Sequence, residues 1–415
     1  MAVPEHIDVG AAGRAAEAIG RGDWGWALEV LGDEAAERQL SPSELELLAR
    51  AAYGSGDLEA ALTAWEELHA RHVAAGDRGA AASAATTVAI YLMMDTGLMA
   101  PVRGWAGRAE RLLEGADECA THAWLAMVRT YERFMSGDME RAHHWAERAI
   151  SIGTRHHAPA PAAIGRVAVA RMLILDGRVE EGLELLDEAA VSIVSGELDP
   201  LSVGIVYCEL ICAMQGLAQY DRAREWTEAM ERWRHGQAFG GINGRCRVHR
   251  AEILRLRGSC DEAEEEALHA CDELRPWMRR EFGWPLTELG TIRLRRGDLA
   301  GAEEAFLAAH ENGWDPQPGL ALVHLARAEV TTASALIRMA LETPLNVPSK
   351  ERPPYGTLRL APLLEAQAEI ALAEGDVVTA RRAAQELAAI ADIFRSRALD
   401  GQRGVGPGAG QPGRR

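Results

Sequence analysis

The 415-residue sequence contains a single lysine, Lys350, among its 44 basic residues. It has no glycine-rich phosphate loop after a strand, no phosphate-loop lysine and no nucleophile elbow, so the common motifs of nucleotide-binding enzymes and serine hydrolases are missing. No apolar run reaches the roughly 18 residues that span a bilayer. Residues 1–10 lack the basic and apolar regions of a secretion signal. We therefore expect a cytoplasmic protein that is not an enzyme and does not bind membranes.

Basic charge is also scarce relative to acidic charge. The sequence has 62 acidic and 44 basic residues, which gives a formal net charge of -18. A surface of this sign repels the phosphate backbone of nucleic acids. We therefore expect no direct binding of nucleic acid by this chain.

The six cysteines show no spacing typical of a secreted disulfide framework, which favours a reducing compartment. Cys208 and Cys212 share one face of a predicted helix, as do Cys246 and His249. A tetrahedral zinc site needs four convergent ligands, and the spacing places no second pair beside either of these. We interpret the cysteines as small apolar residues of a helical core and predict no metal and no other cofactor.

A regularly spaced glycine dominates what the sequence does contain. The glycines are Gly22, Gly56, Gly137, Gly177, Gly258, Gly297 and Gly375. Five positions later stand Ala27, Ala61, Ala142, Gly182, Ala263, Ala302 and Ala380, and seven positions earlier stand Ala15, Ala49, Thr130, Ala170, Ala251, Gly290 and Ala368. The pattern predicts a helix, a left-handed glycine turn and a second helix, with small residues where the two helices approach most closely.

Three weaker units complete a series of ten. They carry Gly97 with Val102, Ala218 with Ala223, and Ala328 with Ala333, so that most units follow one another after 39 to 41 residues. The last two spacings, 31 and 47 residues, indicate a short unit and then an irregular loop over residues 343–357, which contain four prolines. We predict an N-terminal arm (1–10), a helical repeat array (11–398) and a disordered Gly/Pro/Arg tail (399–415).

These marks resemble the tetratricopeptide repeat, although a spacing near 40 residues exceeds the usual repeat of about 34. The segments Tyr91–Trp105 (YLMMDTGLMAPVRGW) and Gly297–Phe306 (GDLAGAEEAF) resemble the helical arms of actinobacterial LuxR-type transcriptional regulators. The resemblance implies an all-α fold, a right-handed superhelical solenoid of antiparallel helix pairs. It also implies a scaffold that holds a peptide or protein partner in a concave groove. The alternative is a truncated regulator arm that lacks its DNA-binding domain.

In this repeat family the inner surface is formed by first-helix residues that lie thirteen, ten, six and three positions before the turn. The candidate groove residues are Tyr91, Trp124, Met127, Tyr131, Phe134, Arg171, Cys208, Cys212, Arg245, Glu252, Arg255 and Trp284. The apolar middle and the arginines that follow suit an amphipathic helix or an extended peptide with acidic groups. Two alternatives stay open. The same side chains can instead be core between neighbouring units, and the array can form a homo-oligomer.

Overall fold

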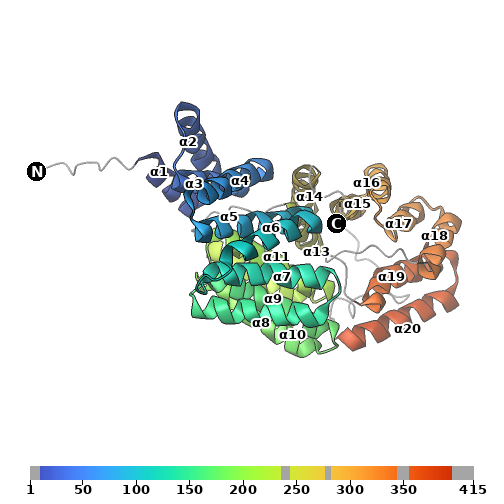
Figure 1. Ribbon diagram of the computed structural model, residues 1–415. Coiled ribbons are helices and arrows are strands. Elements are labelled where there is room, and N and C mark those ends of the chain that lie inside the picture. The colour runs from blue at the N-terminus through green and yellow to red at the C-terminus, as the bar shows by residue number, and fades with distance from the viewer. Residues whose placement is uncertain (1–9, 235–243, 276–281, 344–354, 395–415) are drawn as a thin grey trace, which may run out of the picture. The chain divides into compact units, whose positions relative to one another are not determined.

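The computed structural model describes residues 10–234, 244–275, 282–343 and 355–394. Twenty α-helices follow one another in these ranges and form successive antiparallel pairs (Figure 1). The first helices of the pairs are α1 (Ala11–Arg21), α3 (Pro42–Gly54), α5 (Arg78–Tyr91), α7 (Ala120–Met135), α9 (Pro159–Leu175), α11 (Pro200–Gly216), α13 (Gly244–Arg257), α15 (Gly283–Arg296), α17 (Gly319–Ala326) and α19 (Gly356–Glu374). The second helices are α2 (Trp24–Glu37), α4 (Leu58–Ala75), α6 (Met99–Leu113), α8 (Met139–Arg155), α10 (Val179–Val194), α12 (Tyr220–Arg234), α14 (Cys260–Leu274), α16 (Leu299–Glu311), α18 (Val330–Glu342) and α20 (Val377–Phe394). The predicted all-α array of helix pairs is confirmed.

All ten predicted turn residues adopt the left-handed backbone conformation, with φ between 55° and 89°. Eight of them are glycine, which adopts this conformation without steric cost. The other two are Ala218 (φ 55°) and Ala328 (φ 63°), which keep the turn despite a β-carbon. The weaker units are therefore genuine helix pairs. In the Gly97 unit, a short π-helix, η1 (Leu92–Thr96), joins α5 to its turn.

Aspartate begins the second helix in several pairs. At α4 the Ala60 N–H donates to Asp57 Oδ1 over 2.9 Å, and at α16 the Gly301 N–H donates to Asp298 Oδ1 over the same distance. Each carboxylate accepts from an N–H that has no partner within its helix, and its charge also suits the positive end of the helix dipole. The sequence Gly-Asp thus ends one helix and begins the next.

The small residues lie where they were predicted, between the two helices of a pair. A β-carbon at Gly182 would stand 2.7 Å from the Ala170 carbonyl oxygen, and one at Gly290 would stand 2.7 Å from the Phe306 ring. These distances are shorter than real β-carbon contacts, so only glycine fits. Ala368 is the exception among the predicted small residues, because it is only half-buried.

The chain divides into two compact units. Unit 1 comprises Met1–Leu210 and Glu228–Asn243, and unit 2 comprises Ile211–Thr227 and Gly244–Arg415. Within the described ranges, no helix is both long and apolar enough to cross a membrane.

The short unit predicted before the insertion is present, since α17 has only 8 residues. Most of the predicted loop 343–357, the predicted arm and the predicted tail lie outside the described residues. One boundary needs correction: α19 begins at Gly356, within the predicted loop. The proline-rich composition placed the start of the helix slightly too late.

Candidate functional site

The predicted groove residues are less accessible than their repeat positions suggested. Seven are buried: Tyr91, Met127, Tyr131, Arg171, Cys208, Cys212 and Arg245. Five are half-buried: Trp124, Phe134, Glu252, Arg255 and Trp284. In the candidate set on α7, Met127 is 0% exposed and Tyr131 is 3% exposed, whereas Trp124 and Phe134 are half-buried. The burial of Met127 and Tyr131 agrees with the alternative that these side chains are core between neighbouring units.

In unit 1 the burial has a geometric cause that repeats from pair to pair. The residue three positions before the turn of one pair contacts a residue on the first helix of the next pair. That second residue lies six positions before the turn of the next pair. Tyr53 stacks on Tyr91 in this way, with ring centroids 3.8 Å apart. Phe134 likewise lies under Arg171, whose guanidinium carbon is 5.2 Å from the ring centroid. These positions connect successive first helices instead of facing an open groove.

Charged groups extend the same connections in unit 1. Arg171 on α9 donates to Glu209 on α11 over 2.9 Å, and both side chains are buried. Glu209 lies nine positions before its turn residue, Ala218. An ion pair removed from water in this way requires close geometry, since each charge loses several kcal/mol of hydration. Arg171 is thus held between an aromatic ring on one side and a carboxylate on the other.

In unit 2, residues three positions before one turn make polar contacts with residues nine positions before the next turn. Gln215 on α11 is hydrogen-bonded to His249 on α13. Arg255 on α13 donates from Nε and Nη2 to the two carboxylate oxygens of Glu288 on α15, over 2.6 and 3.3 Å. His249 and Glu288 both lie nine positions before their turns. This position is not among the predicted inner offsets, and it becomes visible only when the residues nine before each turn are compared.

Glu252 belongs to the same network, but its surroundings disfavour the ionised carboxylate. Its carboxylate is 3.9 Å from Arg255, and Tyr220 donates a hydrogen bond to it. Burial, followed by the nearby charge of Glu288, raises the pKa of Glu252 above its ordinary value. Arg255 therefore stands between two carboxylates but pairs closely with only one of them.

Cys208 and Cys212, which share one face of α11, differ in their bonding. Cys208 is disulfide-bonded, which the sequence analysis did not anticipate, and Cys212 is a buried free thiol. The side chain of Cys246 lies outside those described. Among the described residues, no three His, Cys, Asp or Glu side chains lie close enough to hold a metal ion.

On the three first helices α15, α17 and α19 of unit 2, inner residues are half-buried or exposed. On α15 the residues Trp284, Thr287, Thr291 and Leu294 are all half-buried, and on α17 so are Leu322 and Leu325. On α19 the corresponding residues Pro362, Glu365, Glu369 and Leu372 are exposed. We call Trp284, Leu294, Leu322, Leu325, Glu365, Glu369 and Leu372 the open inner surface. The same offsets counted back from Ala328 and Gly375 would have identified its α17 and α19 residues.

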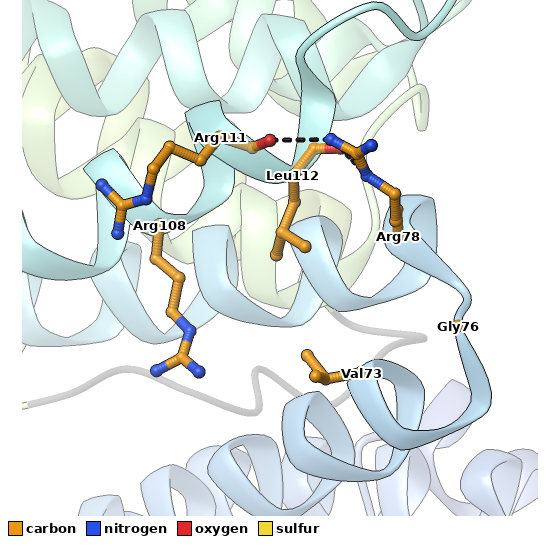
Figure 2. Close-up of a pocket in the computed structure, with 6 residues that line it drawn as sticks. All are labelled: Val73, Gly76, Arg78, Arg108, Arg111 and Leu112. Carbon is orange, nitrogen blue, oxygen red and sulfur yellow. Dashed lines mark hydrogen bonds between the residues drawn. The ribbon is translucent and has the colours of Figure 1, made fainter.

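A separate pocket of about 450 Å³ lies in unit 1 between α4, α5 and α6 (Figure 2). Its lining residues are Val73, Gly76, Arg78, Arg108, Arg111 and Leu112. Arg78 donates from Nε to the Leu112 carbonyl over 3.1 Å and from Nη2 to the Arg111 carbonyl over 2.9 Å. These contacts satisfy carbonyl groups at the end of α6, which have no partner within the helix.

No protein-family model and no curated protein matches the chain. A solved Rap protein complexed with competence and sporulation factor is 12% identical, covers 92% of this chain and 98% of its own, and has a TM-score of 0.46. The human IFIT1 dimer with m7Gppp-AAAA is 14% identical, covers 95% of this chain and 90% of its own, and has a TM-score of 0.41. The resemblance to LuxR-type regulator arms stays a prediction.

Proposed function

We propose that the chain is a non-enzymatic scaffold that binds a peptide or protein partner along the open inner surface of unit 2. The proposal depends on one observation: inner side chains are mostly buried on α5 and α9 of unit 1, whereas on α15 and α17 of unit 2 they are half-buried and on α19 they are exposed. Leu372 is 37% exposed at the far end of this surface. Accessible apolar side chains on consecutive helices are typical of surfaces that bind partners.

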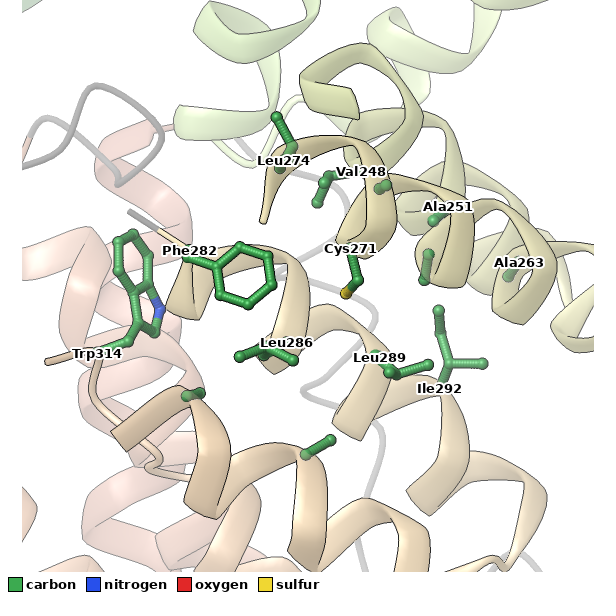
Figure 3. Packing of buried hydrophobic residues seen from close by; sticks show 14 of the residues in the cluster. Val248, Ala251, Ala263, Cys271, Leu274, Phe282, Leu286, Leu289, Ile292 and Trp314 are labelled. Carbon is green, nitrogen blue, oxygen red and sulfur yellow. The ribbon is translucent and has the colours of Figure 1, made fainter. Parts of the chain in front are cut away.

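The open inner surface rests on a packed core. Trp284 packs against a buried cluster from α13, α14, α15 and the segment that follows α16, which includes Val248, Leu274, Phe282 and Trp314 (Figure 3). Its ring also lies 4.9 Å from the His249 ring. Leu322 and Leu325 pack in the same way against a second cluster. A partner would therefore meet side chains that are already positioned, which lowers the entropy lost on binding.

The charges on this surface change the expected partner. The paired arginines had suggested an acidic peptide, but Arg255 is already neutralised by Glu288 and Arg245 is buried. The exposed charged residues among the inner positions of α19 are Glu365 and Glu369. A peptide with apolar side chains and neighbouring basic groups complements this arrangement.

Selection from a random-sequence peptide display library tests the proposal. The wild-type protein should enrich peptides with apolar and basic residues, and a variant with Leu294→Ser, Leu325→Ser and Leu372→Ser should not bind them. The matched control replaces three exposed apolar side chains of the second helices, Leu268→Ser, Leu307→Ser and Met339→Ser, which are 41%, 46% and 58% exposed. This control should bind as the wild type does. Failure of the wild type to enrich any sequence, or equal binding by both variants, would contradict the proposal.

A further inference from the structure

Three arginines line the pocket of unit 1, and none of its six lining residues is acidic. Arg78, Arg108 and Arg111 are exposed, although the chain as a whole carries a net charge of -18. Among the described residues, none of these three arginines forms an ion pair with a carboxylate. Elsewhere many arginines are paired, as Arg129 is with Glu110 over 2.6 Å. The pocket is therefore a local concentration of positive charge on an acidic protein.

The arginines are held by different contacts. Arg78 is fixed at the start of α5 by its hydrogen bonds to the carbonyl groups of Arg111 and Leu112 (Figure 2). Arg108 and Arg111 are three positions apart on α6, so they share one side of that helix. The guanidinium carbon of Arg108 lies 5.8 Å from the centroid of the Trp105 ring. Two guanidinium groups thus retain donors for a ligand, and the third stiffens the pocket.

Packing beneath Trp105 fixes its position. The ring meets the His69 ring edge to face, with centroids 5.2 Å apart. His69 is buried on α4, and its Nδ1 is hydrogen-bonded to the Ala81 carbonyl on α5 over 2.8 Å. One chain of contacts therefore joins the three helices that form the pocket. The Trp105 ring that Arg108 contacts is therefore held in place by packing.

We propose that this pocket binds a small phosphate monoester. Guanidinium groups bind phosphate oxygens through paired hydrogen bonds, and a dianion can accept from more than one arginine. The pocket volume of about 450 Å³ exceeds what a phosphate group fills and is within the usual range for small ligands. Val73 and Leu112 supply apolar contacts for the organic part. The site is separate from the open inner surface and does not depend on the proposed function.

Titration calorimetry with three probes tests the proposal on the full chain. Phenyl phosphate carries both features of the predicted ligand, inorganic phosphate carries only the dianion, and benzoate carries an apolar ring with a single charge. Binding should weaken in that order, and it should weaken further as ionic strength rises. No binding of phenyl phosphate at concentrations up to about 10 mM would overturn the proposal.

Substitutions place the binding in the pocket. Arg108→Gln and Arg111→Gln should each weaken phenyl phosphate binding about tenfold, as expected for loss of a charge-assisted hydrogen bond. Arg103→Gln is the matched control, because Arg103 is an exposed arginine of α6 outside the pocket. Val73→Asp adds a repelling carboxylate at a 45% exposed position and should abolish binding. Val73→Asn introduces a side chain of the same size and shape as Val73→Asp but without the charge, and it should largely retain binding. Equal affinity for wild type, the arginine variants and Val73→Asp would place the anion elsewhere and overturn the assignment.

Discussion

The inner positions of unit 1 and unit 2 share the same repeat offsets but have different environments. In unit 1 Met127 and Tyr131 are buried between successive first helices. In unit 2 the corresponding surface of α15 and α19 stays accessible. Helix length offers a reason: α17, which lies between them in the chain, has only 8 residues, whereas α7 and α9 have 16 and 17. A short helix cannot cover the full inner surface of its neighbours.

The two units also differ in how strongly their inner charges are buried. The pair Arg171–Glu209 in unit 1 has relative side-chain exposures of 10% and 0%, and the pair Arg255–Glu288 in unit 2 has 14% and 10%. Removing one partner of a buried pair leaves a charge with neither water nor counterion. The comparison therefore predicts a graded loss of stability, which substitutions can test directly.

The largest effect should follow from Glu209→Gln in unit 1. The variant removes the carboxylate that neutralises Arg171 in the core, so we expect a loss of about 3 kcal/mol in unfolding free energy. Denaturant unfolding monitored by circular dichroism measures this. Glu188→Gln is the matched control, because Glu188 pairs with Arg166 over 3.4 Å while 65% exposed, and its loss should be below about 0.5 kcal/mol. Equal losses in the two variants would contradict the inference that unit 1 depends on its buried pair.

A smaller loss, about 2 kcal/mol, is expected from Glu288→Gln in unit 2. This variant removes the charge and one of the two acceptor oxygens that Arg255 contacts, but Arg255 still has Glu252 at 3.9 Å and some contact with solvent. The same unfolding measurement applies, with a probe that reports on unit 2. A loss as large as that of Glu209→Gln would remove the difference in burial on which the comparison rests.

The helix pairs were predictable from the sequence because their determinants are local. A left-handed turn, an aspartate cap and a small residue such as Gly182 each act within one pair. Accessibility was not predictable, because whether Tyr131 or Leu372 is exposed depends on the length and position of the next helix. The Arg78 pocket was also missed, since Arg78 and Arg111 lie 33 positions apart along the chain and the lining residues share no repeat offset with the inner surface.

The turns within the helix pairs extend the comparison, since the five predicted turn residues of unit 1 are glycine while two of those in unit 2 are alanine. Ala328→Gly should stabilise the protein by roughly 1 kcal/mol, because an L-residue is strained in the left-handed conformation. Ala218→Gly should gain less, since its methyl group is 8% exposed and its burial would be lost. Thermal unfolding measures both.

Two controls separate turn strain from a general effect of glycine. Ala335 is an exposed residue within α18, so Ala335→Gly should destabilise by about 1 kcal/mol. In unit 1, Gly137 has φ 80°, and Gly137→Ala should destabilise by a similar amount, about 1 kcal/mol. If Ala328→Gly lowers the unfolding temperature as Ala335→Gly does, left-handed strain is not stored at the turns of unit 2.

The smallest effect, below about 1 kcal/mol, should come from Glu252→Gln, and its sign should be opposite to that of Glu288→Gln. Because burial raises the pKa of Glu252 in the folded state, the folded protein holds this proton more tightly than the unfolded chain. The stabilising contribution of that proton is complete below the unfolded pKa and is lost as pH rises through the folded pKa.

Near pH 7 the ionised Glu252 carboxylate therefore lowers the unfolding free energy, and an uncharged glutamine that still accepts a hydrogen bond from Tyr220 removes this loss. Unfolding free energies of the two proteins should converge as pH falls toward the ordinary carboxyl pKa of about 4. A Glu252→Gln variant less stable than wild type near pH 7 would show that the contact with Arg255 outweighs burial.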